Sequence, residues 1–117
     1  MTIRDALGMV ESGDRDKARG RAGEISRFQI KPVLWRNFAA PEFDYHNPNH
    51  AWLVTEKILN ERKALFLRLT KRYPNNFEMY ALWNAPGLLI MNNCDWTKLP
   101  EKIKERCQRF HNLMTST

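Results

Sequence analysis

Apolar residues near the N-terminus recur at helical spacing. Four of them fall at positions i, i+3, i+4 and i+7, which line one side of an α-helix: Ile3, Ala6, Leu7 and Val10. We expect this helix to end at Ser12-Gly13, because glycine adopts the left-handed conformation that terminates many helices. Glu11 lies four residues after Leu7, at the border of the apolar stripe. Partial burial there disfavours the charged form of its carboxyl.

The next segments alternate between polar loops and apolar helical patterns. Residues 14–23 are polar and glycine-punctuated, which predicts a loop with at most a small hairpin. Ser26 is expected to cap a short helical segment, and Pro32 to begin another helix carrying Trp35 and Phe38. Residues 40–50 form a connection in which Phe43, Tyr45 and His46 either reach a ligand cleft or pack against the core.

Three further helices are predicted in the rest of the chain. A long one runs from about Asn49 to Arg72, and its apolar face is lined by Ala51, Val54, Ile58, Leu65 and Leu69. A short helix capped by Asn76 extends through Trp83 and stops at residues 84–87. The last runs from about Leu99 to Met114, and its buried stripe consists of Ile103, Cys107, Phe110 and Met114. The chain is thus expected to be mainly α, with about five helices around a long central helix.

Chain length and net charge limit the number of domains and the kinds of partner. The 117 residues, 43% hydrophobic, fit one domain spanning residues 1–117. No run approaches the roughly 20 apolar residues of a membrane span. A net charge of +6 attracts polyanions, either nucleic acid or the anionic bacterial wall. The basic residues are scattered without a dense arm, so nucleic acid is the weaker interpretation.

The sequence has few residues that could support redox or metal chemistry. Cys94 and Cys107 match no metal motif, and they are either packed thiols or, outside the cytoplasm, a disulfide. Position 107 falls on an apolar helix face, which favours a packed thiol. None of the three histidines has metal-ligand spacing. We therefore expect neither a metal nor a cofactor, and we expect a monomer.

Three short motifs occur in order along the chain. They are Glu11-Ser12-Gly13-Asp14, then, after Ala18 and Gly23, Ser26-Arg27-Phe28-Gln29-Ile30-Lys31-Pro32, and finally Ala81-Leu82-Trp83-Asn84-Ala85-Pro86-Gly87. The series resembles the lysozyme-like family of soluble lytic transglycosylases and goose-type lysozymes. That family has a Glu-Ser pair closing a helix, a Gly-Leu-Met-Gln-Ile-x-Pro-like run and an Ala-x-Tyr-Asn-Ala-Gly motif. The resemblance covers most of the chain and implies a lysozyme-like fold.

This chain departs from the family pattern at several positions. Ser26 and Arg27 stand in place of Gly and Leu, Phe28 replaces Met, Trp83 replaces Tyr, and the spacing between Ala85 and Gly87 differs by one residue, Pro86. The glutamate, the glutamine and the Asn-Ala pair are retained. The chain therefore resembles a divergent branch whose substrate preference is open.

The resemblance implies a glycosidase that cuts the β-1,4 bond between N-acetylmuramic acid and N-acetylglucosamine in peptidoglycan. Glu11 would be the single general acid and base. The substrate-binding residues would be Ser26, Gln29, Tyr80, Trp83 and Asn84, with Tyr80 the candidate if a phenol is needed.

The reaction type depends on whether a second carboxylate takes part. A hydrolytic muramidase positions a water molecule, usually with such a group. The nearby candidates are Asp14, Asp16 and Glu24, none of which is clearly placed, so a lytic transglycosylase is favoured. A catalytically inactive wall-binding module of the same fold is the other alternative.

The expected place of action is the bacterial cell wall, in the periplasm or outside the cell. No export signal is recognisable in the sequence. This absence favours a phage-encoded protein, export by a partner, or a trimmed chain.

Overall fold

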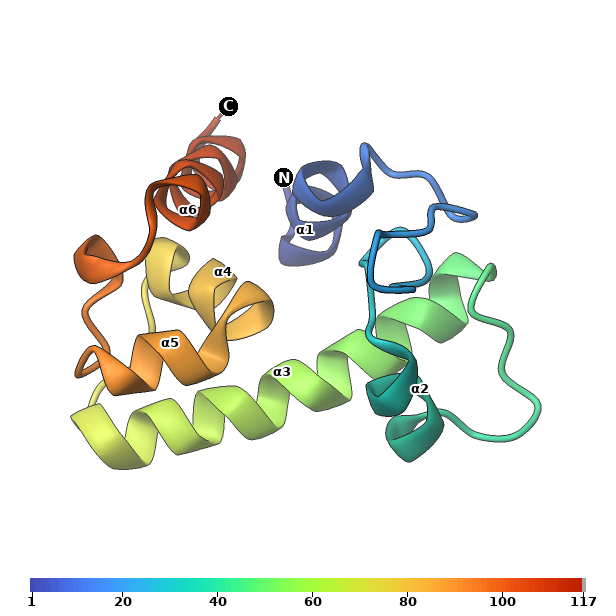
Figure 1. Cartoon of the computed structure of the whole chain (residues 1–117), viewed down its shortest axis with the longest axis horizontal. Coiled ribbons are helices and arrows are strands. Elements are labelled where there is room, and N and C mark those ends of the chain that lie inside the picture. The colour runs from blue at the N-terminus through green and yellow to red at the C-terminus, as the bar shows by residue number, and fades with distance from the viewer. Residues whose placement is uncertain (117) are drawn as a thin grey trace. The chain divides into compact units, whose positions relative to one another are not determined.

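The computed structural model describes residues 1–116 and is mainly helical (Figure 1). Its elements are α1 (Ile3–Ser12), α2 (Pro32–Phe38), α3 (Pro48–Thr70), α4 (Asn76–Asn84), α5 (Pro86–Met91), the 3-10 helix η1 (Trp96–Lys98) and α6 (Glu101–Thr115). Strand-like pairing within the described residues is limited to two isolated antiparallel bridges, Arg19 with Ile25 and Ile25 with Ile30. The mainly helical class predicted from the sequence is confirmed.

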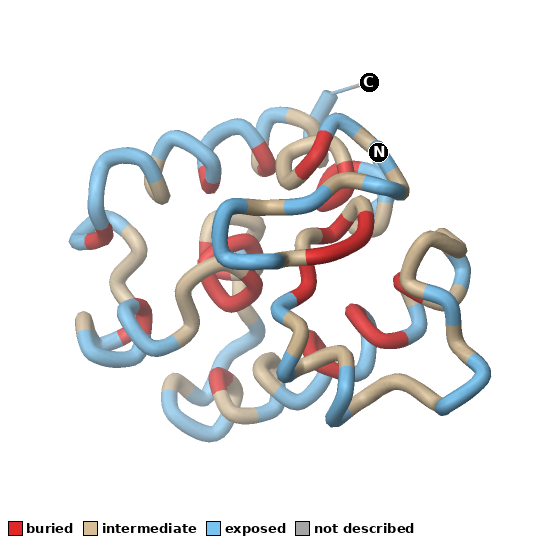
Figure 2. Tube along the Cα trace, turned by 45° about the vertical axis from the view of Figure 1, so that its right-hand side comes forward, coloured by how far each residue is buried: buried red, intermediate tan, exposed pale blue. Residues whose placement is uncertain are grey.

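Contacts divide the chain into two compact units. One unit is Thr2–Ile58, and the other is Met1 together with the chain from Leu59 onward. In both, buried positions are interspersed with exposed ones along the helices (Figure 2). Of the helices in the described residues, none has the length and apolar character that crossing a membrane requires.

Local sequence signals set the helix ends in the Thr2–Ile58 unit. The Thr2 hydroxyl accepts a hydrogen bond from the Asp5 N–H at 3.1 Å and caps α1, which ends at Gly13 in the left-handed region with φ 65°. Pro32 occupies the first turn of α2, as predicted. The Asn47 side-chain oxygen accepts hydrogen bonds from the N–H groups of Asn49 and His50 at the start of α3.

The buried face of α3 partly differs from the predicted one. Ala51, Val54 and Ile58 are buried as expected. Leu69, however, is 53% exposed, and Phe66 is buried in its place at 1%. The prediction for Leu69 was wrong although Leu69 lies on the same side of the helix as Ala51, because the half of α3 after Ile58 belongs to the other compact unit and buries another side, with Leu59 and Phe66.

The unit that begins at Leu59 contains one α-helix, α5, and one 3-10 helix, η1, that were not predicted. Pro86-Gly87 does not simply end α4 but starts α5, because proline at the first helical position needs no N–H partner. The N-cap of α4 is Asn75 rather than the predicted Asn76. Similarly, Pro100 precedes α6 as its N-cap and does not lie in its first turn.

The last helix packs on α4. Cys107 and Phe110 are fully buried, and the rings of Phe110 and Tyr80 lie 5.8 Å apart. Cys94 and Cys107 are both buried free thiols. The packed-thiol interpretation of Cys107 is therefore confirmed.

Candidate active site

Glu11 occupies the last turn of α1, beside buried residues of the same helix. Leu7, one turn earlier, is 1% exposed, and Ser12 is 8% exposed, whereas Glu11 itself is partly buried. Gly13 then turns the chain away in the left-handed conformation. The predicted placement of this carboxyl, at the border of an apolar helix face, is confirmed.

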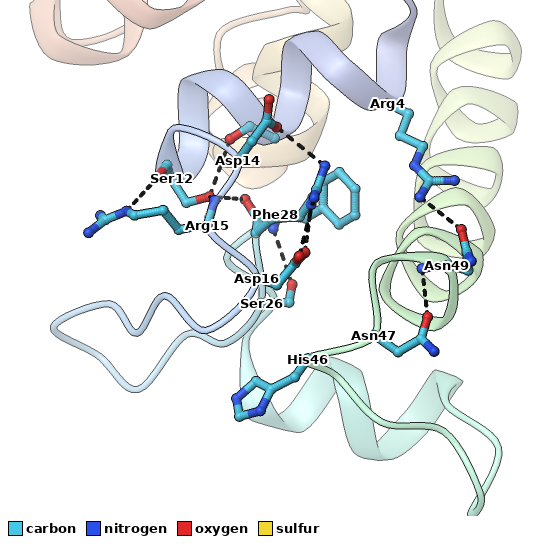
Figure 3. Close-up of polar contacts among 12 residues, drawn as sticks. Arg4, Ser12, Asp14, Arg15, Asp16, Ser26, Phe28, His46, Asn47 and Asn49 are labelled. Atoms are coloured by element: carbon cyan, nitrogen blue, oxygen red, sulfur yellow. Dashed lines mark hydrogen bonds and ion pairs between the residues drawn. The ribbon is translucent and has the colours of Figure 1, made fainter.

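Ser12 ties the end of α1 to the loop that carries Gln29. Its hydroxyl donates to the backbone carbonyl of Arg27 at 2.7 Å and accepts from the N–H of Arg15 at 3.0 Å. Figure 3 shows Ser12 at the end of the helix with its hydroxyl directed at this loop. The first two sequence motifs are thus joined by a partly buried hydrogen bond across 15 positions of sequence.

The second motif forms a tight loop rather than a helical turn. Ile25 and Ile30 exchange backbone hydrogen bonds of 2.9 and 2.8 Å, and the intervening Ser26 and Gln29 both have positive φ, 74° and 54°. The Ser26 hydroxyl accepts from the Phe28 N–H at 3.1 Å. Ser26 therefore stabilises this loop and caps no helix, which corrects the prediction made for it. Phe28 anchors the loop, since it is fully buried with its ring centroid 5.6 Å from that of Trp52.

The Gln29 side chain folds back onto its own loop. Its amide nitrogen donates to the Ser26 carbonyl at 3.0 Å. Its amide oxygen lies close to Gly20, where an added Cβ would come within 2.7 Å of it. Gln29 remains partly exposed, and its substrate-binding role stays a prediction.

The three acidic residues near Glu11 in sequence all have loop partners. Arg27 donates from Nε to Asp16 at 2.7 Å and lies 3.6 Å from Asp14. The hydrogen bond with Asp16, followed by the charges of both carboxylates, raises the pKa of Arg27. Glu24 accepts from the N–H of Ala22 at 2.9 Å. These contacts indicate that all three carboxylates stabilise the loop.

The third motif lies at the end of α4. Tyr80 is 0% exposed and Trp83 is 7% exposed, whereas Asn84 is partly exposed. Arg62 donates to the carbonyls of Leu82 and Trp83 at 2.8 and 2.9 Å and lies over the Trp83 ring. Burial lowers the pKa of Arg62. Complete burial leaves Tyr80 without exposed surface for a ligand, which favours a packing role.

The predicted site residues fall in both compact units. Glu11, Ser26 and Gln29 belong to Thr2–Ile58, and Tyr80, Trp83 and Asn84 belong to the unit that begins at Leu59. In the first unit, Ser12 next to Glu11 is hydrogen-bonded to the loop that carries Ser26 and Gln29, and in the second the three residues share the end of α4. A common substrate site for all six residues stays a prediction.

The aromatic residues of the 40–50 connection contact neighbours in their own unit. Phe43 stacks on His50 with ring centroids 4.7 Å apart, and Tyr45 meets Trp35 edge to face at 5.8 Å. His46 lies against Tyr45 at 4.6 Å. Of the two interpretations left open by the sequence, these contacts favour packing.

One buried charge was missed by the sequence reasoning. Glu78 on α4 is 2% exposed, accepts from the Asn75 N–H at 2.8 Å and forms a two-pronged ion pair with Arg72. Asn75 in turn accepts from the Glu78 N–H, completing a capping box. The Asn-x-x-Glu spacing of residues 75 and 78 was the signal that could have revealed it.

Comparison with protein-family models, with curated proteins and with solved structures finds no match to this chain. Residues 1–116 also contain no group of three or more His, Cys, Asp or Glu side chains that could hold a metal ion.

Proposed function

We propose that the protein is a peptidoglycan-cleaving lytic transglycosylase of lysozyme-like fold in which Glu11 is the single general acid and base. The observation that carries the proposal is the hydrogen bond from the Ser12 hydroxyl to the Arg27 carbonyl. It fixes the end of the helix bearing Glu11 against the loop bearing Gln29. Two of the three motifs that resemble the family therefore belong to one local structure.

The proposed chemistry uses one carboxyl group twice, first as the acid and then as the base. Glu11 in its neutral form donates its proton to the glycosidic oxygen as the bond to C1 of N-acetylmuramic acid breaks. The resulting carboxylate then takes the proton of the muramyl 6-hydroxyl as that oxygen attacks C1. The product is a 1,6-anhydro sugar, no water is consumed, and Glu11 returns to its neutral form.

The partners of the neighbouring carboxylates support this reaction over hydrolysis. A hydrolytic muramidase usually needs a second carboxylate to position water. Asp14 and Asp16 lie against the Arg27 guanidinium, and Glu24 accepts from a backbone N–H. Each of these contacts holds the carboxylate in the loop.

The decisive test is Glu11→Gln on purified peptidoglycan. We expect the wild type to clear a peptidoglycan gel and to release anhydro-muramyl products, identified by mass spectrometry. Glu11→Gln should lower the rate at least about 100-fold, because it removes the transferable proton while keeping the size of the side chain. Glu56→Gln, at an exposed position of α3, is the matched control and should retain full activity.

Two results would contradict the proposal. Reducing-end muramic acid instead of the anhydro sugar would assign the hydrolytic reaction. Equal clearing by wild type and Glu11→Gln, with unchanged circular dichroism, would remove Glu11 from the chemistry.

A catalytically inactive wall-binding module is the second candidate. It is favoured by the complete burial of Ser26 and Tyr80 and by the replacement of the motif tyrosine with Trp83, which has no hydroxyl. It predicts that wild type and Glu11→Gln bind wall sacculi equally and that neither releases soluble fragments. In both candidates the bacterial cell wall is the proposed place of action.

A further inference from the structure

A separate hollow lies in the Thr2–Ile58 unit, between the 19–25 loop and α2. It measures about 230 Å³ and is lined chiefly by Arg19, Pro32, Trp35, Arg36 and Tyr45. Two of these side chains are arginines, and no acidic side chain of the described residues lines it. The hollow therefore offers positive charge beside aromatic surface.

One of the two arginines is held in place by aromatic neighbours. Arg19 donates to the Tyr45 hydroxyl at 3.2 Å, and its guanidinium carbon lies 5.8 Å from the centre of the Tyr45 ring. Tyr45 is itself placed edge to face on Trp35. This arrangement limits the motion of a side chain that would otherwise be freely mobile, so less conformational entropy is lost when it binds an anion.

The hollow adjoins the loop that carries Gln29. Ile25, part of its lining, is bridged on one side to Arg19 and on the other to Ile30, the residue that follows Gln29. Gly20, next to Arg19, lies against the Gln29 amide oxygen. A chain molecule in contact with Gln29 could therefore extend a side branch into the hollow.

We propose that this hollow binds a carboxylate of the peptide stem that branches from peptidoglycan strands, with Arg19 and Arg36 as its partners. The inference rests on the proposed function. Guanidinium groups bind carboxylates through paired, charge-assisted hydrogen bonds, and the rings of Trp35 and Tyr45 supply apolar surface for the aliphatic part of the stem. The enzyme would accordingly prefer glycan that still carries its peptides.

The test compares two soluble probes of the same glycan, one with its stem peptides and one from which an amidase has removed them. Binding is measured by calorimetry on the Glu11→Gln protein, so that the probes stay intact. We expect the stem-bearing probe to bind at least about tenfold more tightly, and Arg19→Ala/Arg36→Ala to abolish this difference without weakening binding of the bare glycan.

The matched control is Lys17→Ala/Arg21→Ala, which removes the same charge from exposed positions of the neighbouring loop that do not line the hollow. This control should keep the preference. Equal affinity for both probes, or an equal loss in the control, would overturn the inference. So would tight binding of duplex DNA that is lost only in Arg19→Ala/Arg36→Ala, because the hollow would then be a phosphate site.

The two proposals fail in different ways. Cleavage of bare and stem-bearing glycan at equal rates by the wild type, together with equal binding, would reject the stem site and leave the transglycosylase intact. Absence of cleavage of either substrate would reject the transglycosylase regardless of what the hollow binds.

Discussion

Gly13 determines where α1 ends and therefore where Glu11 and Ser12 lie. Its φ of 65° is in the left-handed region, and its N–H donates to the Met9 carbonyl at 2.9 Å. A side chain at this position would meet no neighbour within 4 Å. Backbone conformation alone, without a clash against any neighbour, therefore favours glycine here.

Replacing Gly13 with alanine tests this directly. We expect Gly13→Ala to lower the free energy of unfolding by about 1 kcal/mol, since a Cβ disfavours the left-handed conformation. The measurement is urea unfolding followed by circular dichroism. Gly87→Ala is the control, because Gly87 also has open space around it but lies in a helix without positive φ. The Gly87→Ala protein should be as stable as the wild type or more stable. An equal loss of stability in both variants would show that the positive φ of Gly13 is not the cause.

The placement of some motif residues could be predicted from the sequence, and the backbone conformation of others could not. Glu11 and Gly13 could be placed because helical spacing and a glycine signal both act within a few residues. The positive φ values of Ser26 and Gln29 could not be predicted, since neither residue type requires them. They follow from the pairing of Ile25 with Ile30 and from burial of Phe28, which depend on the packed unit.

At the scale of elements, α4 is fixed at both of its ends. The capping box of Asn75 and Glu78 satisfies N–H groups at its start, and Arg62 satisfies two carbonyls at its finish. Arg72 adds an ion pair to Glu78. The helix is short, nine residues, so these end contacts contribute a large share of its stability.

Removing the N-cap should weaken α4 measurably. Asn75→Ala is expected to reduce the free energy of unfolding by about 1 kcal/mol, because the Glu78 N–H loses its acceptor. The midpoint of urea denaturation reports the change. Asn60→Ala, at an exposed position inside α3, serves for comparison and should be neutral or slightly stabilising. An Asn75→Ala protein with the same denaturation midpoint as the wild type would mean that the ion pair between Arg72 and Glu78 is enough to stabilise the start of α4.

The ends of the short helices were harder to predict. Proline can follow one helix or begin the next, and either of two adjacent asparagines can be the N-cap, so the sequence pattern alone did not choose between these alternatives. Pro86 was taken as a stop for α4 but begins α5, and the N-cap of α4 was placed at Asn76 instead of Asn75. The long helix and α6 were predictable because their apolar repeats extend over many turns.

For the whole molecule, buried Cys107 links stability to pH. Burial raises the pKa of its thiol from 9.0 to about 11. The folded protein therefore holds this proton more tightly than the unfolded chain does. Stability contributed by the neutral thiol is complete below about pH 9 and is lost as the pH rises toward about 11.

We expect this loss to reach roughly 2 to 3 kcal/mol at high pH. Urea unfolding at a series of pH values from 8 upward, on wild type and Cys107→Ala, isolates the effect, because lysines and tyrosines titrate in both proteins. The stability advantage of the wild type should shrink as the pH rises. A difference that stays constant with pH would contradict the assignment.

Helix α3 belongs to both compact units, since the boundary falls between Ile58 and Leu59 in its middle. Helical hydrogen bonds form and break cooperatively along a continuous segment, and fraying of one half exposes the end of the other. The protein should consequently melt in a single step, although its contacts divide into two units. A destabilising substitution in either unit would then lower the midpoint of the one shared unfolding transition. Gly13→Ala and Asn75→Ala, one in each unit, should both have this effect.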